Sequence, residues 1–410
     1  MKFNKISKCR SCNSKKLKFF FNFGLMELST YFPEKNSSKK ESVPLEVIYC
    51  QICKLFQLNH NYELKKLFNN DYGYRSGINK SMKAHFQTII NDIQKKIKLK
   101  KNDIFLDIAS NDGTLLSMIK KNGLKKIGID PTIRKYKKFY KKDIKTSAKF
   151  FSSKNYLSLD KNKVKLITSI AVFYDVHNPN LFIKDVSNII RKDGIWILEQ
   201  SYLPSIIKNL AFDSICHEHV TYFTLKQLNI ILSNNNLRVI DCTLNEMNGG
   251  SIRFFIASKE SYLKVNKDNI NKIKNIESIF YKNLKKKMDK FKQKILDNKI
   301  QLLTILKKLK AKNKKIHVYG ASTKGNVLLQ YFNINKSYID FISDRNPRKN
   351  NHYTPGTKIK IISESKSRKL LPDYYFVLPW HFKHEILKRE NKIRKKGCKF
   401  IFPLPKLKVY

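Results

Sequence analysis

The stretch from Ile104 to Asp130 constrains this chain more than any other. An apolar run ends in Asp107, a turn of small and polar residues follows, and an amphipathic segment leads to a second apolar run that ends in Asp130. This order predicts a β–loop–α–β unit whose loop lets a ligand approach the backbone closely. An acid that ends the second strand can accept hydrogen bonds from both hydroxyls of a ribose. The stretch therefore predicts a site for a nucleoside-containing cofactor.

The turn after Asp107 narrows the choice of cofactor. A dinucleotide-binding turn needs Gly-x-Gly-x-x-Gly to receive a pyrophosphate, and this turn lacks that pattern. It resembles motif I of class I S-adenosylmethionine-dependent methyltransferases, whose cofactor carries an ammonium that acidic residues can hold. A Rossmann-like unit without a ligand is the alternative. The residues expected to bind the cofactor are Asp107, Ala109, Ser110, Asn111, Asp112, Gly113 and Asp130.

Two cysteine pairs with the same internal spacing lie near the N-terminus, Cys9-x-x-Cys12 and Cys50-x-x-Cys53. Four thiolates suit tetrahedral Zn²⁺ and leave no open position for catalysis. We therefore expect a structural zinc ion that stabilises a region too small for a core of its own. Seven cysteines, four of them in two close pairs, suit a reducing cytoplasm better than a disulfide framework. No run approaches the ~20 apolar residues of a membrane span, so we expect no such span.

The formal charge of +51 suggests nucleic-acid binding at first sight. Of the 83 basic residues 11 are arginine, so lysine accounts for the other 72, and the lysines are spread almost evenly. Proteins that read bases or clamp phosphates favour clustered arginine forks. The charge is more typical of drift in an A+T-rich genome, and we expect no nucleic-acid partner.

The chain divides into three regions, 1–70, 71–257 and 258–410. The middle region alternates strand-like and helix-like stretches, which predicts a mainly parallel sheet covered by helices. The six candidate strands are Ile104–Ile108, Lys126–Asp130, Leu166–Ile170, Gly194–Glu199, Arg238–Thr243 and Ile252–Ser258. Apolar residues recur at helical spacing over 260–311 and predict one long helix. A second α/β unit follows, with the turn Gly-Ala-Ser-Thr-Lys-Gly-Asn at 320–326. It is no nucleoside-triphosphate loop, because Asn326 stands where such a loop needs lysine.

Cys216-His217-Glu218-His219 is the densest group of titratable residues. Adjacent residues cannot all face one metal ion, so acid–base chemistry fits better, with structural hydrogen bonding as the alternative. The tyrosines of the segment 72–77 could cover a cofactor, donate to a substrate, or seal a seam between domains. Arg253 could contact a phosphate or pair with a carboxylate, or its glycine-rich neighbourhood could simply bend a hairpin.

Taken in order, these motifs resemble bacterial C-methyltransferases that act on nucleotide-linked 4-keto-deoxyhexoses. The likeness extends over nearly the whole chain and includes 72–77, 107–116, 128–131, 217–219, 249–253, 320–326, 344–347, 355–357 and 379–380. It implies an α/β protein with a zinc-binding region, a class I methyltransferase Rossmann-like domain and a second Rossmann-like domain at the C-terminus. Its partner would be a small-molecule nucleotide sugar.

The resemblance also implies a mechanism. A base removes the proton next to the keto group, and the carbanion takes the methyl group. His219 is the expected base and Glu218 its neighbour, with Tyr72 or Tyr74 supporting the sugar. The residues expected to contact the substrate are His217, Tyr222, Arg253, Ser322, Lys324 and Asn326.

Two departures from the family pattern concern the acceptor. Cys216 stands where the best-known members have tyrosine, and a thiol donates hydrogen bonds more weakly than a phenol. His177 lies at a shifted position in the loop that carries a histidine in that branch. An RNA or protein methyltransferase with a zinc knuckle and a non-catalytic sugar-nucleotide-binding protein are the alternative functions.

Overall fold

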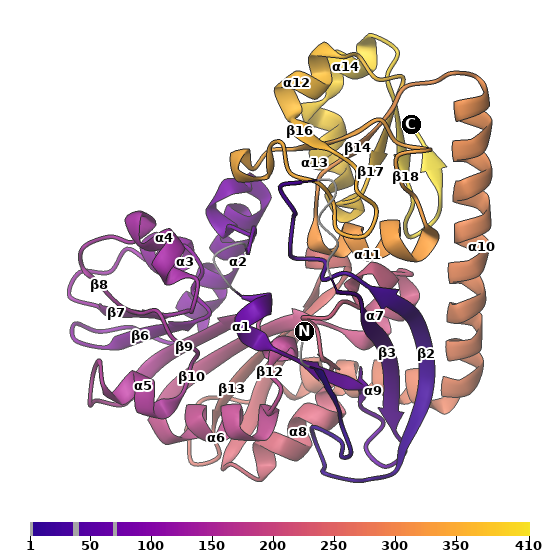
Figure 1. Ribbon diagram of the computed structural model, residues 1–410. Coiled ribbons are helices and arrows are strands. Elements are labelled where there is room, and N and C mark those ends of the chain that lie inside the picture. The colour runs from indigo at the N-terminus through magenta and orange to yellow at the C-terminus, as the bar shows by residue number, and fades with distance from the viewer. Residues whose placement is uncertain (1–2, 36–40, 69–71) are drawn as a thin grey trace.

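The computed structural model describes residues 3–35, 41–68 and 72–410. The expected boundary between the first two regions, at 70–71, lies outside these residues. Figure 1 shows a central sheet, the indigo N-terminal strands beside it, and the C-terminal unit above. No helix within the described ranges is long and apolar enough to cross a membrane.

The central sheet confirms the expected α/β architecture. Its strands from β10 to β8 pair in parallel, and β13, next to the edge strand β12, runs antiparallel to both of its neighbours, β10 and β12. All six expected strands are present, and the sheet gains one edge strand, β8, that its largely polar sequence concealed. The order is β12-β13-β10-β9-β6-β7-β8, with bounds Leu237–Asn245, Ser251–Ser258, Ile190–Ser201, Val164–Ile170, Ile104–Ile108, Lys125–Ile129 and Ile144–Ser147.

Helices cover both faces of this sheet (Figure 1). Because successive strand residues point to opposite faces, Phe105 packs in one buried cluster with α2 and α3, and Leu106 packs in another with α6 and α8. The helices are α2 Lys80–Lys96, α3 Thr114–Met118, α4 Ile133–Tyr136, α5 Ser153–Leu157, α6 Pro179–Ile189, α7 Leu203–Lys208 and α8 Leu225–Ser233.

The N-terminal region forms a four-stranded antiparallel sheet that borrows a strand. Its order is β11-β4-β3-β2, and β11 is Thr221–Tyr222 from the middle region. The other strands are β2 Leu17–Met26, β3 Val43–Cys50 and β4 Phe56–Leu58; β1 Phe3–Lys5 pairs with β5 His60–Tyr62, and the short helix α1 Leu64–Leu67 follows. The zinc-binding region is therefore continuous with the segment that follows His219.

The long helix expected over 260–311 is two helices, a correction to the sequence interpretation. Helix α9 spans Lys267–Lys282 and α10 spans Leu284–Ala311. The break lies at Asn283, whose backbone is non-helical with φ −127° and ψ 43°. Buried Glu277 on α9 accepts hydrogen bonds from the backbone of Leu225 and Lys226, which ties α9 to α8. Helix α10 then runs up to the C-terminal unit (Figure 1).

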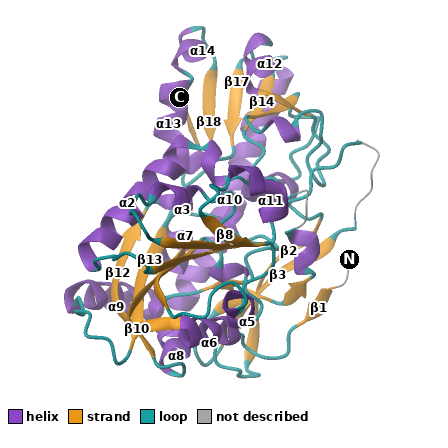
Figure 2. Cartoon of the chain, turned by 90° about the vertical axis from the view of Figure 1, so that its left-hand side faces the viewer, coloured by secondary structure: helices purple, strands orange, loops and turns teal. Residues whose placement is uncertain are grey.

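The C-terminal unit is a second, mainly parallel sheet with helices beside it (Figure 2). Its order is β16-β15-β14-β17-β18-β19, with bounds Ile361–Ser363, Phe341–Asp344, Ile316–Tyr319, Tyr374–Val377, Lys399–Phe402 and Lys408–Val409. Its helices are α11 Thr323–Phe332, α12 Glu364–Lys369, α13 Lys383–Arg389 and α14 Asn391–Lys395.

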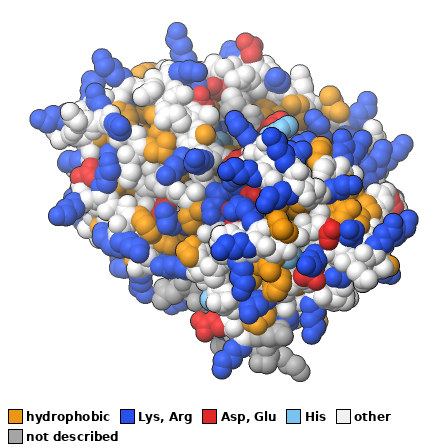
Figure 3. Space-filling view, turned by 90° about the horizontal axis from the view of Figure 1, so that it is seen from above, with side chains coloured by type: hydrophobic (Ala, Val, Ile, Leu, Met, Phe, Trp, Pro, Cys, Tyr) orange, Lys and Arg blue, Asp and Glu red, His pale blue; other side chains and the backbone are white. Residues whose placement is uncertain are grey.

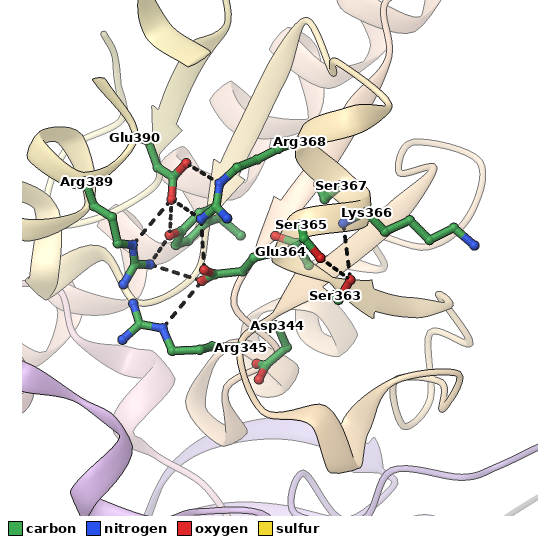
Figure 4. Close-up of polar contacts among 12 residues, drawn as sticks. Asp344, Arg345, Ser363, Glu364, Ser365, Lys366, Ser367, Arg368, Arg389 and Glu390 are labelled. Atoms are coloured by element: carbon green, nitrogen blue, oxygen red, sulfur yellow. Dashed lines mark hydrogen bonds and ion pairs between the residues drawn. The ribbon is translucent and has the colours of Figure 1, made fainter. Parts of the chain in front are cut away.

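An ion-pair network joins the helices of this unit at one side of its sheet (Figure 4). The guanidinium of Arg368 donates to both oxygens of buried Glu390 at 2.8 and 2.6 Å and to Glu364 at 2.9 Å. Arg389 and Arg345 also approach Glu364, at 3.1 and 3.8 Å. Elsewhere the basic side chains are scattered across the face that Figure 3 shows.

Candidate functional site

The structure brings the four N-terminal cysteines together. Their sulfur atoms all lie within 4.8 Å of one another, and two Sγ–Sγ distances are 3.6 Å. A tetrahedral ion with Zn–S bonds of ~2.3 Å separates its sulfurs by about 3.8 Å, so the cluster fits zinc. In both pairs the amide after the second cysteine donates to the carbonyl of the first, from Asn13 and from Lys54, and both of these residues have positive φ. The two pairs therefore form matching knuckles.

The loop after β6 has an unusual backbone. Ala109, Asn111 and Gly113 have φ of 61°, 51° and 72°, so alternate residues are left-handed. Such a conformation costs a non-glycine residue ~1–2 kcal/mol, so other contacts must hold it. One is Asp130 at the end of β7, whose carboxylate accepts the Asn111 amide at 2.9 Å and both donors of Thr132 at 2.6 Å.

Asp107 lies buried at the carboxyl edge of the sheet. Its carboxyl group accepts a hydrogen bond from the Thr168 hydroxyl at 2.6 Å. Burial raises the pKa of Asp107 to about 7, and the neighbouring acids Asp130 and Asp112 add to the shift. A bound cation would stabilise the ionised form of this buried carboxyl group, because it would offset the cost of burying the negative charge.

The segment 72–77 lies against the loop that follows β6. Asp112 accepts hydrogen bonds from Arg75 Nε and the Gly77 amide, both at 3.0 Å, and from the Thr114 hydroxyl at 2.6 Å. The Ser76 amide donates to Asn111 Oδ1 at 2.9 Å. Two residues expected to bind cofactor, Asp112 and Asn111, thus position the neighbouring segment with their side chains.

Other tyrosine contacts complete this junction. The hydroxyls of Ser110 and Tyr140 lie 2.6 Å apart. The phenol of Tyr136 donates to the carbonyl of Tyr74 at 2.9 Å, and Asn346 of the C-terminal unit donates to the carbonyl of Gly73 at 2.9 Å. The segment 72–77 therefore contacts both Rossmann-like units.

His219 lies in the turn between residues 212–214 and β11. Its Nδ1 donates to the backbone carbonyl of Ser214 at 2.7 Å, and its ring packs on that of Tyr174 with centroids 4.0 Å apart. A carbonyl oxygen can only accept, so Nδ1 carries the proton and Nε2 keeps its lone pair. Burial, with the nearby Lys324 ammonium, lowers the pKa of His219 to about 3. The imidazole is therefore neutral at physiological pH.

Carboxyl groups gather beside this imidazole. Glu218 is buried; its Oε2 accepts from the Ser29 hydroxyl at 3.3 Å, and its Oε1 has no hydrogen-bond partner within the described part of the chain. Burial raises the pKa of Glu218, and burial together with Glu218 raises that of Asp175. The pKa values of Cys216 and Tyr72 are raised by burial and by the same two acids. The cluster therefore favours protonated, hydrogen-bond-donating groups.

His217, Tyr222 and His177 contact or lie beside the N-terminal region and not the cluster around His219. The buried His217 ring meets that of Tyr62 edge-on, with centroids 4.9 Å apart, and burial lowers the pKa of His217 to about 4. Tyr222 belongs to β11 and pairs with β4. His177 lines a polar cavity between the zinc knuckles and α6, where burial and Arg10 lower its pKa to about 4. Its shift in the sequence thus corresponds to a place beside the zinc-binding region.

The remaining expected substrate contacts divide in the same way. Arg253 is buried, and its guanidinium donates to Glu199 at 2.8 Å and to Asp92 at 2.5 Å, so it pairs with carboxylates. Ser322 caps α11, and Asn326 donates to the carbonyl of Ser29 at 2.8 Å. The side chains of Arg253, Ser322 and Asn326 therefore form hydrogen bonds within the protein. Their use by a substrate would require the present contacts to exchange.

Lys324 reaches the middle region from the C-terminal unit. Its ammonium donates to Ser214 Oγ at 3.1 Å and to the carbonyl of Asn248 at 3.0 Å. Beside it lie three residues that the sequence did not single out as a site: Asp213, Trp380 and His381. Trp380 Nε1 donates to Asp213 Oδ2 at 2.9 Å, and burial with Lys324 lowers the pKa of His381 to about 3.

The parallel sheet with acids at the ends of β6 and β7 and the four-cysteine cluster define a zinc-containing S-adenosylmethionine-dependent methyltransferase. Comparison with known proteins agrees. A zinc binding domain matches residues 9–68, a methyltransferase domain matches 79–241, and a C-methyltransferase C-terminal domain matches 246–405. The three matches, in this order along the chain, fit a C-methyltransferase family.

A curated relative covers almost the whole chain. It is the C-methyltransferase NovU of Streptomyces niveus, 26% identical over 98% of this chain and 97% of its own. Among solved structures, the PH0226 protein of Pyrococcus horikoshii is 13% identical with a TM-score of 0.37, covering 48% of this chain and 99% of its own. The mitomycin 7-O-methyltransferase MmcR is 10% identical with a TM-score of 0.37, covering 47% and 57%.

Proposed function

We propose that this enzyme methylates a carbon next to the keto group of a nucleotide-activated 4-keto-deoxy sugar. The observation that carries the proposal is the tautomer of His219, whose Nδ1–H is held by the carbonyl of Ser214. Its Nε2 lone pair is thereby free to take a proton, the role of a general base in making a carbanion. The family match to C-methyltransferases supports transfer to carbon.

The cofactor supplies an electrophilic methyl group, and the chain's own residues orient it. We assign the amino-acid end of S-adenosylmethionine to the neighbourhood of Asp107, whose buried carboxyl would be ionised by a cation. We assign the ribose hydroxyls to Asp130, which ends β7. The left-handed loop of Ala109 and Gly113 keeps side chains away from the backbone between them. Alignment of donor and acceptor would supply much of the rate enhancement.

We assign the sugar nucleotide to the seam between the middle region, 71–257, and the C-terminal region, 258–410. The reasons are the position of Lys324 beside His219 and the contact of the segment 72–77 with both regions. Tyr72 and Cys216 are the proposed hydrogen-bond donors to the sugar, because burial and nearby acids keep both protonated. None of the seven cysteines, all of which lie in the described residues, forms a disulfide, which supports a cytoplasmic location.

Solvent exchange tests the proposal without the methyl donor. Thymidine- and uridine-diphosphate 4-keto-6-deoxyglucose are incubated with the enzyme in D₂O, and deuterium at the carbon next to the keto group is followed by mass and NMR. The wild-type enzyme should introduce one deuterium, and His219→Ala should slow this by about 10²–10⁴-fold.

The matched control is His384→Ala, which removes an exposed histidine of α13. It should exchange at the wild-type rate. Full exchange by His219→Ala would refute the base assignment, and absence of exchange by the wild-type enzyme with any 4-keto sugar tried would refute the proposed substrate class.

A further inference from the structure

Lys324 and the proposed base, His219, both form hydrogen bonds with the same residue, Ser214. The side-chain oxygen of Ser214 accepts a hydrogen bond from the Lys324 ammonium at 3.1 Å, and its backbone carbonyl accepts one from His219 Nδ1 at 2.7 Å. The two groups come from different regions of the chain, α11 and the turn before β11. Ser214 therefore fixes the position of the cation relative to the imidazole.

The second anchor of Lys324 is built just as firmly. The carbonyl of Asn248, which accepts at 3.0 Å, belongs to a turn in which Asn248 has φ of 56°. The next residue, Gly249, has φ of 89°, and a Cβ there would lie 2.9 Å from the ring of Trp380. Only a compact turn lets Trp380 pack so closely. With two of the three N–H donors placed in this way, the third is not used by any described residue.

The titratable groups near the ammonium include two histidines and one acid, Asp213. His219 and His381 are both neutral at physiological pH, their pKa values lowered by burial and by Lys324 itself. Asp213 is held by Trp380, and burial raises its pKa while Lys324 opposes that rise. Burial lowers the pKa of Lys324, and Asp213 opposes that change. A desolvated cation in such a place interacts strongly with any negative charge that develops nearby.

We propose that Lys324 is a catalytic residue whose free N–H binds the keto oxygen of the sugar and stabilises the enolate oxygen. This inference rests on the proposed function. His219 Nε2 takes the proton from the carbon next to the carbonyl. The electrons of the C–H bond form the carbon–carbon double bond, and the carbonyl π pair moves to the oxygen, which the ammonium binds. The charges balance, with one enolate formed for one imidazolium.

This arrangement explains how a histidine with so low a pKa can act as a base. In the free enzyme, an imidazolium at His219 would be repelled by the Lys324 ammonium. Once an enolate lies between them, each cation faces the anion, and the repulsion is offset by two attractions. Proton transfer is therefore favourable only together with formation of the oxyanion, which restricts the base to substrates with a correctly placed carbonyl.

The test is the exchange reaction in D₂O with saturating 4-keto sugar and no methyl donor. Lys324→Met removes the charge while keeping the length of the chain, and should lower the maximal exchange rate by about 10²–10³-fold. The limb of its pH–rate profile that reports deprotonation of His219 should shift to higher pH, because burial still lowers the pKa of His219 but the added effect of the Lys324 charge is gone. The dissociation constant for S-adenosylhomocysteine should change less than about twofold, since Lys324 lies outside the proposed cofactor site.

Lys336→Met is the matched control, because Lys336 is exposed and follows the C-terminal end of α11, whereas Lys324 lies in its first turn. It should behave as the wild type. If Lys324→Met does not fold, Lys324→Arg provides the reading, since it should keep the low base pKa while losing part of the rate. An exchange rate within threefold of the wild type, or a defect confined to KM with an unshifted pH profile, would overturn the role of Lys324. Failure of the wild-type enzyme to exchange any such sugar would instead overturn the proposed function and this inference with it.

Discussion

Asp107 gives the sharpest quantitative prediction. Its carboxyl keeps its proton up to about pH 7 in the folded protein, against an ordinary value of 3.8. Between these values the folded state binds more protons than the unfolded chain, so the free energy of unfolding falls as pH rises through that window. About three pKa units correspond to ~4 kcal/mol. Asp107→Asn, which can still accept from Thr168, should therefore stabilise the cofactor-free protein by up to ~4 kcal/mol at pH 8 and have little effect near pH 4.

The same substitution should weaken cofactor binding. A cation binds to the ionised carboxyl, so wild-type affinity for S-adenosylhomocysteine should fall about fivefold from pH 7 to pH 6, as expected for a group with a pKa of about 7. Asp107→Asn should abolish this pH dependence and reduce affinity at pH 8 roughly 10- to 100-fold, the value of one charged hydrogen bond.

Urea unfolding of the cofactor-free protein at pH 5 and pH 8 and isothermal titration calorimetry measure the two effects. Asp289→Asn is the control, because that carboxylate is 60% exposed and pairs with Lys292 about one turn along α10. Its effect should stay within ~0.5 kcal/mol. An Asp107→Asn protein that is less stable than the wild type at pH 8, or that binds S-adenosylhomocysteine equally well, would refute the reasoning.

Two further predictions concern the framework. Cys53→Ser should reduce bound zinc from one ion per chain towards none and lower the melting temperature. It should also slow proton exchange, because it displaces β11, Thr221–Tyr222. A metal assay, a thermal melt and the D₂O reaction measure these effects, and a variant that retains a full zinc equivalent would contradict the prediction. Arg253→Lys should cost about 3–5 kcal/mol in urea unfolding, because lysine cannot reach both Glu199 and Asp92 with a planar fork; an unchanged unfolding midpoint would show that the fork is dispensable.

Local sequence patterns predicted the sheet well because each inner strand is a short apolar run between turns. Ile104–Ile108 was placed to the residue. β8 was missed because Ile144–Ser147 contains a single apolar residue and lies at an edge, where little burial is required. The expected single helix over 260–311 failed at Asn283, since apolar periodicity continues on both sides of a break that tertiary contacts impose.

The candidate site was predictable where chemistry is local in sequence. The cysteine pairs and the acids that end β6 and β7 are of this kind. Asp213 and His381 were not found, because neither carries a pattern of its own and they meet only when the C-terminal unit docks on the methyltransferase domain. Arg253 could be assigned to a carboxylate or a phosphate from sequence; its partners, Glu199 and Asp92, lie far away in the chain.

The shared strand β11 has a consequence for how the chain is made. The N-terminal sheet leaves the ribosome early, yet the edge of β4 at Phe56 and Gln57 stays unpaired until Thr221 and Tyr222 emerge. At about 5–20 residues per second, synthesis of the intervening ~160 residues takes roughly 8–30 s. During that time the zinc knuckles can load metal while an open strand edge is exposed to other chains. Thr221 and Tyr222, which follow His219, therefore pair with β4 late in synthesis. The N-terminal sheet and the turn that carries His219 then become ordered together.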